Sequence, residues 1–549
     1  MYQYDELDRQ VVNNRVQQFR GQMNRYLSGE LSEEAFLPLR LQNGLYIQKH
    51  APMLRVAVPY GMLSAAQLRC MAGVCDRYDR GYCHITTRQN VQFNWVKMEE
   101  VADILETLAT VEMHAIQTSG NCIRNTTSDP LAGVAADEQT DPRPYCEIIR
   151  QWSSLHPEFA FLPRKFKIAV IGAAEDRASI QLHDVGLQLV TNADGETGFK
   201  VWVGGGLGRT PMLATLICEF LPQAYLLGYL KAVLRVYNRY GRRDNKYKAR
   251  IKILVNSLGA ADFSAQVEAE FQRTNSEEYW LTEAELAHAR SFFTEPAYAQ
   301  VNVAAETEEP DSPAYRHWLR RNVRAHRVGG YAIVTLSLKH QGTAPGDISS
   351  EQLRRVADLA ERFSFGEARN TQQQNIVLAD VKRSDLFALW QEACRLELAA
   401  PTIGTLSDVV CCPGGDFCGL ANARSLPINS AIQQRFDDLD YLYDLGDLSL
   451  RISGCINACA HHHIANIGIL GVDKKGEEFY QLTLGGEVGE RSRIGKVLGP
   501  SIPLDAVPDA LEAIVDVFVE QRHEEEPFIS TYERIGKDKF KERVYATGH

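Results

Sequence analysis

The sequence predicts an α/β (α+β) protein that is internally duplicated, in which each half has a small unit followed by a larger one. Two observations predict this. The stretch Ser64–Arg69 returns 285 residues later as Ser349–Arg354, and Thr87–Val91 returns at the same offset as Gln372–Ile376. A longer segment then follows each copy. Self-similarity at a fixed offset is typical of a duplicated architecture.

The same elements are expected in the same order in each copy. An N-capping serine precedes an amphipathic helix, and a strand-rich segment and a second helix follow. The helices are expected at 64–78, 98–109, 349–363 and 383–395, and the strands at 83–96 and 368–381. The units are then a helical arm (1–45), a first small half-domain (46–113), a first large domain (114–290), a linker (291–325), a second small half-domain (326–398) and a second large domain (399–549).

The composition limits the kinds of partner that the chain can have. The formal net charge of −11 over 549 residues gives no general attraction to nucleic acid. The N-terminus is acidic and polar, so we expect no signal or transit peptide. A membrane-spanning helix needs an apolar stretch of about 18 residues, and no apolar stretch in the sequence is nearly that long. A cytoplasmic protein without a membrane partner is expected.

Four cysteines near the C-terminus form a ligand pattern. They are spaced C-x5-C and C-x3-C, at Cys412, Cys418, Cys455 and Cys459. Four thiolates close a 4Fe–4S site, and they also bind structural zinc, although zinc ligand pairs are usually two to four residues apart on tight turns. Disulfides are the third alternative, and they are rare in reducing compartments. Cys411 is an alternative ligand to Cys412.

The residues Ser453-Gly-Cys-Ile-Asn-Ala-Cys459 resemble the cluster signature of the sirohaem-dependent sulfite and nitrite reductases. The resemblance extends over essentially the whole chain. It implies a pseudo-twofold fold in which two ferredoxin-like half-domains and two larger α/β domains hold one sirohaem and one 4Fe–4S cluster. It also implies that Cys412, Cys418, Cys455 and Cys459 bind the cluster, and that Cys459 bridges to the sirohaem iron.

The same resemblance assigns an anion-binding set. Sirohaem carries eight carboxylates, so its burial requires many Arg and Lys residues. The family pattern places substrate binding and proton delivery at Arg55, Arg124, Lys165 and Lys167. It places the ligands of the sirohaem carboxylates at Arg88, Gln92, Arg164 and Gln374. In the repeat, Gln373 stands where the first copy has Arg88, so this charge is present in one half only.

Three further motifs have competing interpretations. The basic run 238–252 could bind RNA, but by resemblance it lies against the cofactor and contributes one or two cations to it. The glycines of Gly204–Arg209 are expected to allow close approach to the macrocycle, because the lysine of a nucleotide-binding loop is missing. His461–His463 are expected at the surface or behind the cluster, since adjacent histidines point in different directions.

The resemblance implies a six-electron reduction of a small oxyanion. Lys165 and Lys167 favour sulfite, because nitrite-preferring relatives tend to have Lys-x-Asn at this place. The first hypothesis is therefore an assimilatory sulfite reductase of sulfur assimilation and cysteine biosynthesis. Assimilatory nitrite reductase is the second, and a zinc- or cluster-bearing RNA-binding protein is the third. A ferredoxin or a diflavin reductase would have to supply the electrons.

One position departs from the family pattern. Some members join a tyrosine covalently to a cysteine beside the haem. Here the tyrosine is Tyr46, whereas the expected cysteine position is Ser119. We expect no cross-link.

Overall fold

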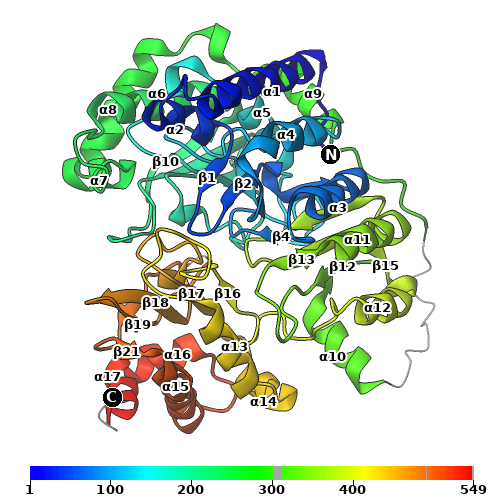
Figure 1. Ribbon diagram of the computed structural model, residues 1–549, viewed down its shortest axis with the longest axis vertical. Coiled ribbons are helices and arrows are strands. Elements are labelled where there is room, and N and C mark those ends of the chain that lie inside the picture. Colours follow the sequence, from blue (N-terminus) through cyan, green and yellow to red (C-terminus); the bar gives the residue numbers. More distant parts are fainter. Residues whose placement is uncertain (301–311, 490, 547–549) are drawn as a thin grey trace.

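The computed structural model describes residues 1–300, 312–489 and 491–546. The helical arm and the first large sheet lie at one end of the molecule, and the second large sheet with the C-terminal helices lies at the other (Figure 1). The arm consists of α1 (Glu6–Leu27) and α2 (Glu33–Gln42), which begin at the N-caps Asp5 and Ser32. The expected arm is confirmed as helical.

Two small antiparallel sheets correspond to the two copies of the repeat, and they exchange a strand. The first has the order β1-β2-β5-β4-β13 and the second the order β11-β12-β15-β14-β3. Thus β3 of the first copy completes the second sheet, and β13 of the second copy completes the first. The strands are β1 (Leu45–Ile47), β2 (Pro52–Val56), β3 (Met62–Ser64), β4 (Tyr82–Ile85), β5 (Val91–Phe93), β11 (Val323–Ala325), β12 (Tyr331–Leu336), β13 (Asp347–Ser349), β14 (Glu367–Asn370) and β15 (Ile376–Lys382).

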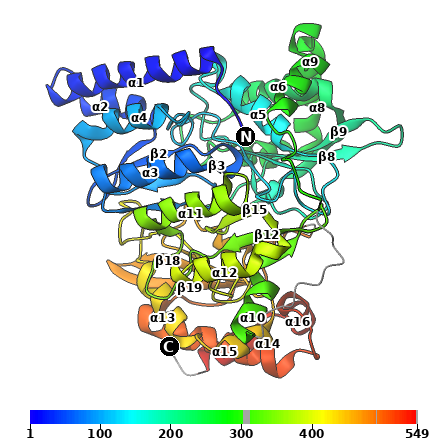
Figure 2. The ribbon, with the colours of Figure 1, turned by 90° about the vertical axis from the view of Figure 1, so that its right-hand side faces the viewer.

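Helices cover these sheets as the repeat predicts. The helices α3 (Ala65–Tyr78) and α11 (Ser350–Phe363) lie side by side in both views (Figures 1 and 2), and each begins with a capping box. The predicted N-caps Ser64 and Ser349 are therefore confirmed. The second helices are α4 (Val101–Ala109) and α12 (Leu386–Arg395), each preceded by one 3₁₀ turn.

A reciprocal pair of hydrogen bonds joins the two copies. Gln89 Nε2 donates to the carbonyl oxygen of Asn370 at 3.1 Å, and Gln374 Nε2 donates to that of Ile85 at 3.1 Å. Both glutamines have φ near +60° and are buried. Since equivalent side chains make equivalent bonds in opposite directions, the copies are related by a pseudo-twofold axis. The expected duplication is confirmed.

Each large unit is built on a mixed sheet. The first has the order β10-β9-β8-β7-β6, with β6, β7 and β8 parallel and β8, β9 and β10 antiparallel. Its strands are β6 (Thr127–Ser128), β7 (Ile168–Ile171), β8 (Val185–Thr191), β9 (Thr197–Val203) and β10 (Thr215–Pro222). Its helices are α5 (Arg143–Ser153), α6 (Leu226–Tyr240), α7 (Ile251–Leu258), α8 (Ala260–Thr274) and α9 (Glu283–Ser291).

The second large sheet repeats this order as β16-β17-β18-β19-β20, with β21 also paired to β19. Its first three strands are parallel, as in the first sheet. The strands are β16 (Val410–Cys411), β17 (Leu450–Ser453), β18 (Ile467–Lys474), β19 (Glu477–Leu484), β20 (Lys496–Val497) and β21 (Ile502–Pro503). The helices are α13 (Leu426–Arg435), α14 (Leu439–Leu445), α15 (Val507–Gln521), α16 (Phe528–Ile535) and α17 (Lys537–Tyr545).

Part of the predicted linker belongs to the second half-domain. Residues 301–311 lie outside the described part of the chain. Residues 313–325 form α10 (Pro313–Asn322) and β11, and β11 pairs with β12. The acidic, Pro-containing composition that suggested a linker did not reveal this helix, in which Trp318 is fully buried.

Candidate active site

A cavity of about 630 Å³ lies where the first large unit, the first half-domain and the cysteine loops meet. All twelve residues that the sequence analysis assigned to the site line this one cavity. The N-terminal half contributes the cations, and the C-terminal half contributes the cysteines. The twelve are Arg55, Arg88, Gln92, Arg124, Arg164, Lys165, Lys167, Gln374, Cys412, Cys418, Cys455 and Cys459.

The charge of the cavity lining is one-sided. Eight of the lining residues are Arg or Lys, and none is Asp or Glu among the described residues. Such a cavity is costly unless an anion binds in it, because like charges repel one another in a partly desolvated space. Since the whole chain carries a net charge of −11, this local excess is a property of the site. It suits a polyanion such as the eight carboxylates of sirohaem.

Backbone amides distinguish Cys412 from its neighbour Cys411. The sulfur of Cys412 accepts a hydrogen bond from Gly454 N at 3.2 Å, and that of Cys418 accepts one from Leu420 N at 3.4 Å. Cys411 Sγ instead donates to the carbonyl oxygen of Cys412. A thiolate requires donors, so these contacts favour Cys412 as the ligand.

The thiols of this group depend on a metal to lose their protons. Burial, followed by the neighbouring Cys459, raises the pKa of Cys412 to about 12. Burial also raises the pKa of Cys455 to about 11. Bound iron reverses this preference, because metal coordination deprotonates a thiol.

The spacing of the cysteines also bears on the choice of metal. In the described residues, no three His, Cys, Asp or Glu side chains converge as the ligands of a single metal ion do. Tetrahedral zinc with Zn–S bonds of about 2.3 Å requires sulfurs within about 4 Å of one another. The described cysteines are therefore not gathered as the ligands of a single zinc ion.

Two of the predicted arginines are held in place by neutral partners. Gln92 Oε1 accepts from Arg55 Nε at 2.9 Å and from Arg55 Nη2 at 2.6 Å. Arg124 donates to the backbone carbonyl oxygens of Thr118 and Gly120. The positive charge of each guanidinium is therefore not cancelled by a carboxylate. Gln92, expected to bind sirohaem, is seen here to orient Arg55.

The two predicted lysines line the cavity, and the residue between them is buried. Phe166 is fully buried between Lys165 and Lys167, as the alternation of the sequence predicts, although β7 begins only at Ile168. Burial, followed by Arg124, lowers the pKa of Lys165 to about 7. Burial, followed by Arg88 and Lys165, lowers the pKa of Lys167 well below its usual range. Among the described residues, neither ammonium group has a hydrogen-bond partner.

Arg88 and Arg164 are the predicted cations for the sirohaem carboxylates. Burial, followed by Arg124, lowers the pKa of Arg88 to about 9, and its Nη2 donates to the carbonyl oxygen of Asn125 at 2.6 Å. Burial and then Arg124 lower the pKa of Arg164 as well. A nearby anion would relieve the repulsion that these two guanidinium groups experience.

Gln374 is fully engaged with protein groups. Besides its bond to Ile85, its Nε2 lies 3.1 Å from His84 Nε2, and its Oε1 accepts from Cys411 N at 2.9 Å. It therefore links the first half-domain to the strand that leads into the cysteine loop. Its predicted role as a ligand of sirohaem stays a prediction beside this structural one.

The tyrosine expected to lack a cross-link lies beside cations. The guanidinium of Arg55 is 5.1 Å from the centre of the Tyr46 ring. Burial would raise the pKa of Tyr46, but Arg55, Arg124 and a hydrogen bond from Ser119 together lower it. Cys122, the thiol nearest in sequence to Ser119, donates to the carbonyl oxygen of Ser119.

Of the two positions expected for the histidine run, the surface is not the one observed for His461 and His462. His461 and His462 are buried, and His461 lines the cavity. His463 Nε2 lies 3.1 Å from the carbonyl oxygen of Gly208, so it bridges the cysteine segment to the glycine loop. A positive φ at His461 turns the chain inward. This conformation could not be read from three adjacent histidines.

The glycine loop has a different use from the expected one. None of the described residues 204–209 lines the cavity. Instead, the loop carbonyls of Gly206, Leu207 and Thr210 accept from Lys252 Nζ at 2.5–3.1 Å. A Cβ on Gly206 would lie 2.8 Å from Arg250 Nη2. The glycines therefore allow approach to the basic run rather than to the cavity.

The basic run 238–252 is divided by the fold. Arg250 and Lys252 turn inward, and Arg250 forms a two-pronged ion pair with the buried Asp184. Arg243, Lys246 and Lys248 stay exposed. Asp184 and its pairing with Arg250 were missed in the sequence, because the partners lie 66 residues apart with no periodic signal.

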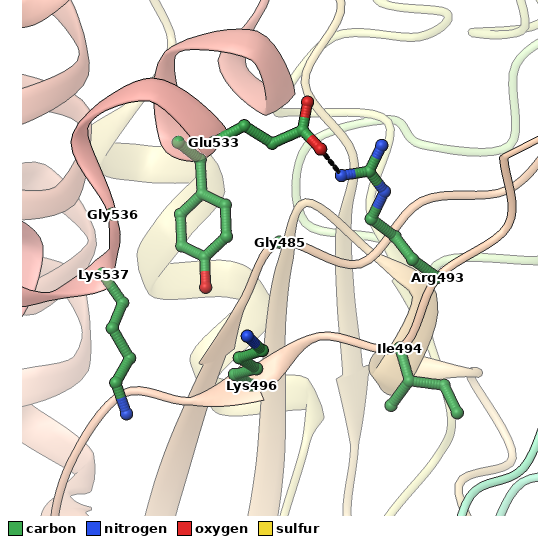
Figure 3. A pocket seen from close by; sticks show the side chains of 8 residues that line it. Gly485, Arg493, Ile494, Lys496, Glu533, Gly536 and Lys537 are labelled. Carbon is green, nitrogen blue, oxygen red and sulfur yellow. Dashed lines mark hydrogen bonds and ion pairs between the residues drawn. The ribbon is translucent and has the colours of Figure 1, made fainter.

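A second cavity of about 450 Å³ lies between β19–β20 and α16 (Figure 3). Arg493 is already paired there with Glu533 and with Glu487. The other two cations that line this second cavity are Lys496 and Lys537. With no cysteine and with a carboxylate beside its arginine, it lacks the features of the first cavity.

Family models match most of the chain. The Nitrite/Sulfite reductase ferredoxin-like half domain matches residues 46–111 and 326–396, and the Nitrite and sulphite reductase 4Fe-4S domain matches residues 119–274 and 404–548. The chain belongs to the nitrite and sulfite reductase family. It is therefore an oxidoreductase with a 4Fe–4S cluster and sirohaem, and the cavity described above has the thiolates and cations that these two groups require.

This chain also aligns with individual relatives over most of their length. A "Sulfite reductase [ferredoxin]" of Mycobacterium tuberculosis (strain ATCC 25618 / H37Rv) is 30% identical over 88% of this chain and 82% of its own. A chloroplastic "Ferredoxin--nitrite reductase" of Arabidopsis thaliana is 27% identical over 85% and 76%. The structure of the Mycobacterium tuberculosis NirA protein matches with a TM-score of 0.77 at 27% identity, covering 93% of this chain and 92% of that one.

Helices in the described ranges are all too short or too polar to cross a membrane.

Proposed function

We propose that the chain is an assimilatory sulfite reductase that reduces sulfite to sulfide by six electrons. The observation that carries the proposal is the cavity lining, in which the four predicted cluster cysteines occur together with eight cations and, among the described residues, no carboxylate. Sulfite reductases with ferredoxin as donor are among its relatives at about 30% identity. When bound, the cluster and sirohaem would pass on electrons from the external donor and supply the iron at which the anion is reduced.

In this proposal, the protein residues bind the anion and supply protons. Arg55 and Arg124, fixed by Gln92 and by backbone carbonyls, hold sulfite oxygens with charge-assisted hydrogen bonds. Lys165 and Lys167 donate protons as the oxygens leave as water. Lysine suits this task better than arginine, because a partly buried ammonium group can release its proton near neutral pH.

The cofactor contacts are also proposals. Cys412, Cys418, Cys455 and Cys459 would bind the cluster, with Cys459 shared with the sirohaem iron. Arg88, Arg164, Gln92 and Gln374 would face the sirohaem carboxylates. The lining of one common cavity by all of these residues supports the assignment.

Ferredoxin is the proposed electron donor, because relatives of both substrate classes carry it in their names. A diflavin reductase stays an alternative. The cytoplasmic location and the absence of a nucleic-acid or membrane partner stay predictions from composition.

Nitrite reduction to ammonia is the second candidate, favoured by the nitrite reductases among the relatives. The two candidates differ in the charge that the site must hold, since sulfite can bind as a dianion and nitrite as a monoanion. The pair Lys165 and Lys167 supports sulfite.

The proposal is tested on the purified protein. The absorption spectrum is expected to show a Soret band and a red-region sirohaem band, and a colourless protein would contradict it. Steady-state rates with reduced methyl viologen, measured for sulfite and for nitrite, then separate the two candidates. A higher kcat/KM for nitrite would overturn the choice of sulfite.

A further inference from the structure

Asp184 is a fully buried carboxylate directly behind the cavity. Its Oδ2 accepts a hydrogen bond from the backbone N of Lys167 at 2.8 Å. Its own carbonyl oxygen accepts from Gly204 N at 3.1 Å. Asp184 therefore fixes the backbone from which the Lys167 side chain extends to the cavity, although it does not line the cavity itself.

Arg250 compensates the charge of Asp184. Its Nε donates to Oδ1 at 2.9 Å and its Nη2 to Oδ2 at 2.8 Å. A bidentate pair of this kind satisfies both carboxylate oxygens and has a defined geometry. Without the guanidinium, a buried carboxylate beside Lys167 would attract the ammonium group itself.

The other half of the molecule has the same backbone contact without the charges. There, Ser449 N donates to Asn466 Oδ1 at 2.8 Å, at the corresponding position of β17 and β18. An amide thus suffices to hold this strand. The carboxylate occurs in the half that has the lysine, which indicates a purpose beyond backbone support.

We propose that Asp184 and Arg250 form a positioning pair for Lys167. The carboxylate fixes the backbone of the lysine, and the guanidinium keeps that carboxylate from capturing the ammonium group, which stays directed at the bound anion. This inference rests on the proposed function in one respect, namely that Lys167 faces the substrate.

Four charged groups have the largest effects on the charge state of Lys167. Arg88, Lys165 and Arg250 disfavour its protonated form, and Asp184 favours it. Burial lowers the pKa of His183 well below the usual range, so this neighbour of Lys167 stays neutral. Removing either member of the pair therefore changes the local charge by one unit, and the two changes have opposite signs.

The test compares Asp184→Asn, Arg250→Gln and the double variant in the holoenzyme. Two pH profiles are recorded: that of kcat/KM, and that of the sulfite dissociation constant, measured from the change in sirohaem absorption. Asp184→Asn is expected to shift the alkaline midpoint down by roughly one to three pH units, since a unit charge at about 4–12 Å acts through an effective dielectric constant of about 20. Arg250→Gln is expected to shift it up by a similar amount, and the double variant to restore it.

Two controls separate charge from structure. Arg250→Lys keeps the charge and loses the bidentate geometry, so its midpoint should stay within about 0.3 pH unit of the parent. Arg243→Gln removes an exposed cation of the same run and should leave the midpoint unchanged. Singles that shift the midpoint in the same direction, or not at all, would overturn the proposal and leave the pair a purely structural role.

The outcome does not depend on which anion the enzyme prefers. Nitrite can replace sulfite in both profiles, because the argument requires only an anion beside Lys167. Suppose that the enzyme reduces nitrite faster than sulfite, while the midpoint still moves down in Asp184→Asn and up in Arg250→Gln. This result would overturn the proposed substrate and support the positioning pair.

Discussion

The two halves of the molecule share a framework and differ in what they present to the cavity. Gln89 and Gln374 make mirrored hydrogen bonds, and the backbone bonds at Lys167 and Ser449 are the same. At the cavity the equivalence ends, because Arg88 is replaced in the repeat by Gln373, and Lys167 by Ser449. The two halves therefore share the hydrogen bonds that hold the backbone, and they differ in the residues that line the common cavity.

The largest expected effect comes from the cysteine side. Replacing Cys459 with Ser should reduce activity to background and remove both the cluster and its coupling to sirohaem, because one thiolate would serve both metals. Iron analysis and absorption spectra measure this. Cys411→Ser is the matched control and should keep the cluster. Four cluster irons with normal coupling in Cys459→Ser would refute the assignment.

The next effect comes from the cationic side. Lys165→Arg keeps the positive charge but removes a group that can release a proton near pH 7. We expect kcat to fall by about 100-fold or more, the usual contribution of a general acid, with a smaller change in KM. Arg55→Lys, which keeps a cation at a binding position, should raise KM more than it lowers kcat. Equal behaviour of the two variants would contradict the division of roles.

A smaller effect concerns the choice of anion. Lys167→Asn removes one cation from the site, and a lost charge-assisted hydrogen bond costs about 1.5–3 kcal/mol. That is roughly a ten- to hundredfold change at about 1.4 kcal/mol per decade. The ratio of kcat/KM for nitrite over sulfite should rise. A proportional loss for both anions would show that Lys167 does not select sulfite.

The shared framework can be tested with the mirrored glutamines. Gln89→Ala and Gln374→Ala should each lower the free energy of unfolding by about 1–3 kcal/mol, since each leaves buried backbone groups unpaired. Chemical denaturation measures this. Because only Gln374 lines the cavity and binds Cys411 N, only its replacement should also lower cofactor content. Equal cofactor loss in both variants would contradict the difference drawn between the halves.

The smallest expected effect is an absence of change. Peptides that contain Tyr46 should have the unmodified mass, because Ser119 occupies the position of the cysteine and the Cys122 thiol is hydrogen-bonded to the Ser119 carbonyl. Mass spectrometry of a digest checks this. A Tyr46 peptide joined to one from 115–125 would show that Cys122 had replaced the missing partner.

The sequence allowed much of this architecture to be predicted, for physical reasons that differ between elements. The paired helices could be predicted from the repeat at an offset of 285 residues, because N-caps and helical periodicity are local signals. The exchange of β3 and β13 could not be predicted, since strand pairing between copies leaves no local pattern. The helix α10 was hidden by acidic, Pro-containing neighbours, although it buries Trp318.

The site divides in the same way. Motifs located the cysteines and cations, because the chemistry of the family requires those residue types at fixed spacing. The inward turn at His461 and the Asp184–Arg250 pair depend on tertiary contacts between distant segments. No sequence motif indicated either of these two features.

A single steady-state comparison shows whether this enzyme reduces sulfite in the cavity between its two halves. The purified enzyme, with reduced methyl viologen as donor, is assayed for sulfide from sulfite and for ammonia from nitrite at matched pH. We expect six electrons to be consumed per sulfide formed and kcat/KM to be higher for sulfite than for nitrite. A higher kcat/KM for nitrite, or no sulfide at all from an enzyme loaded with both cofactors, would contradict this expectation.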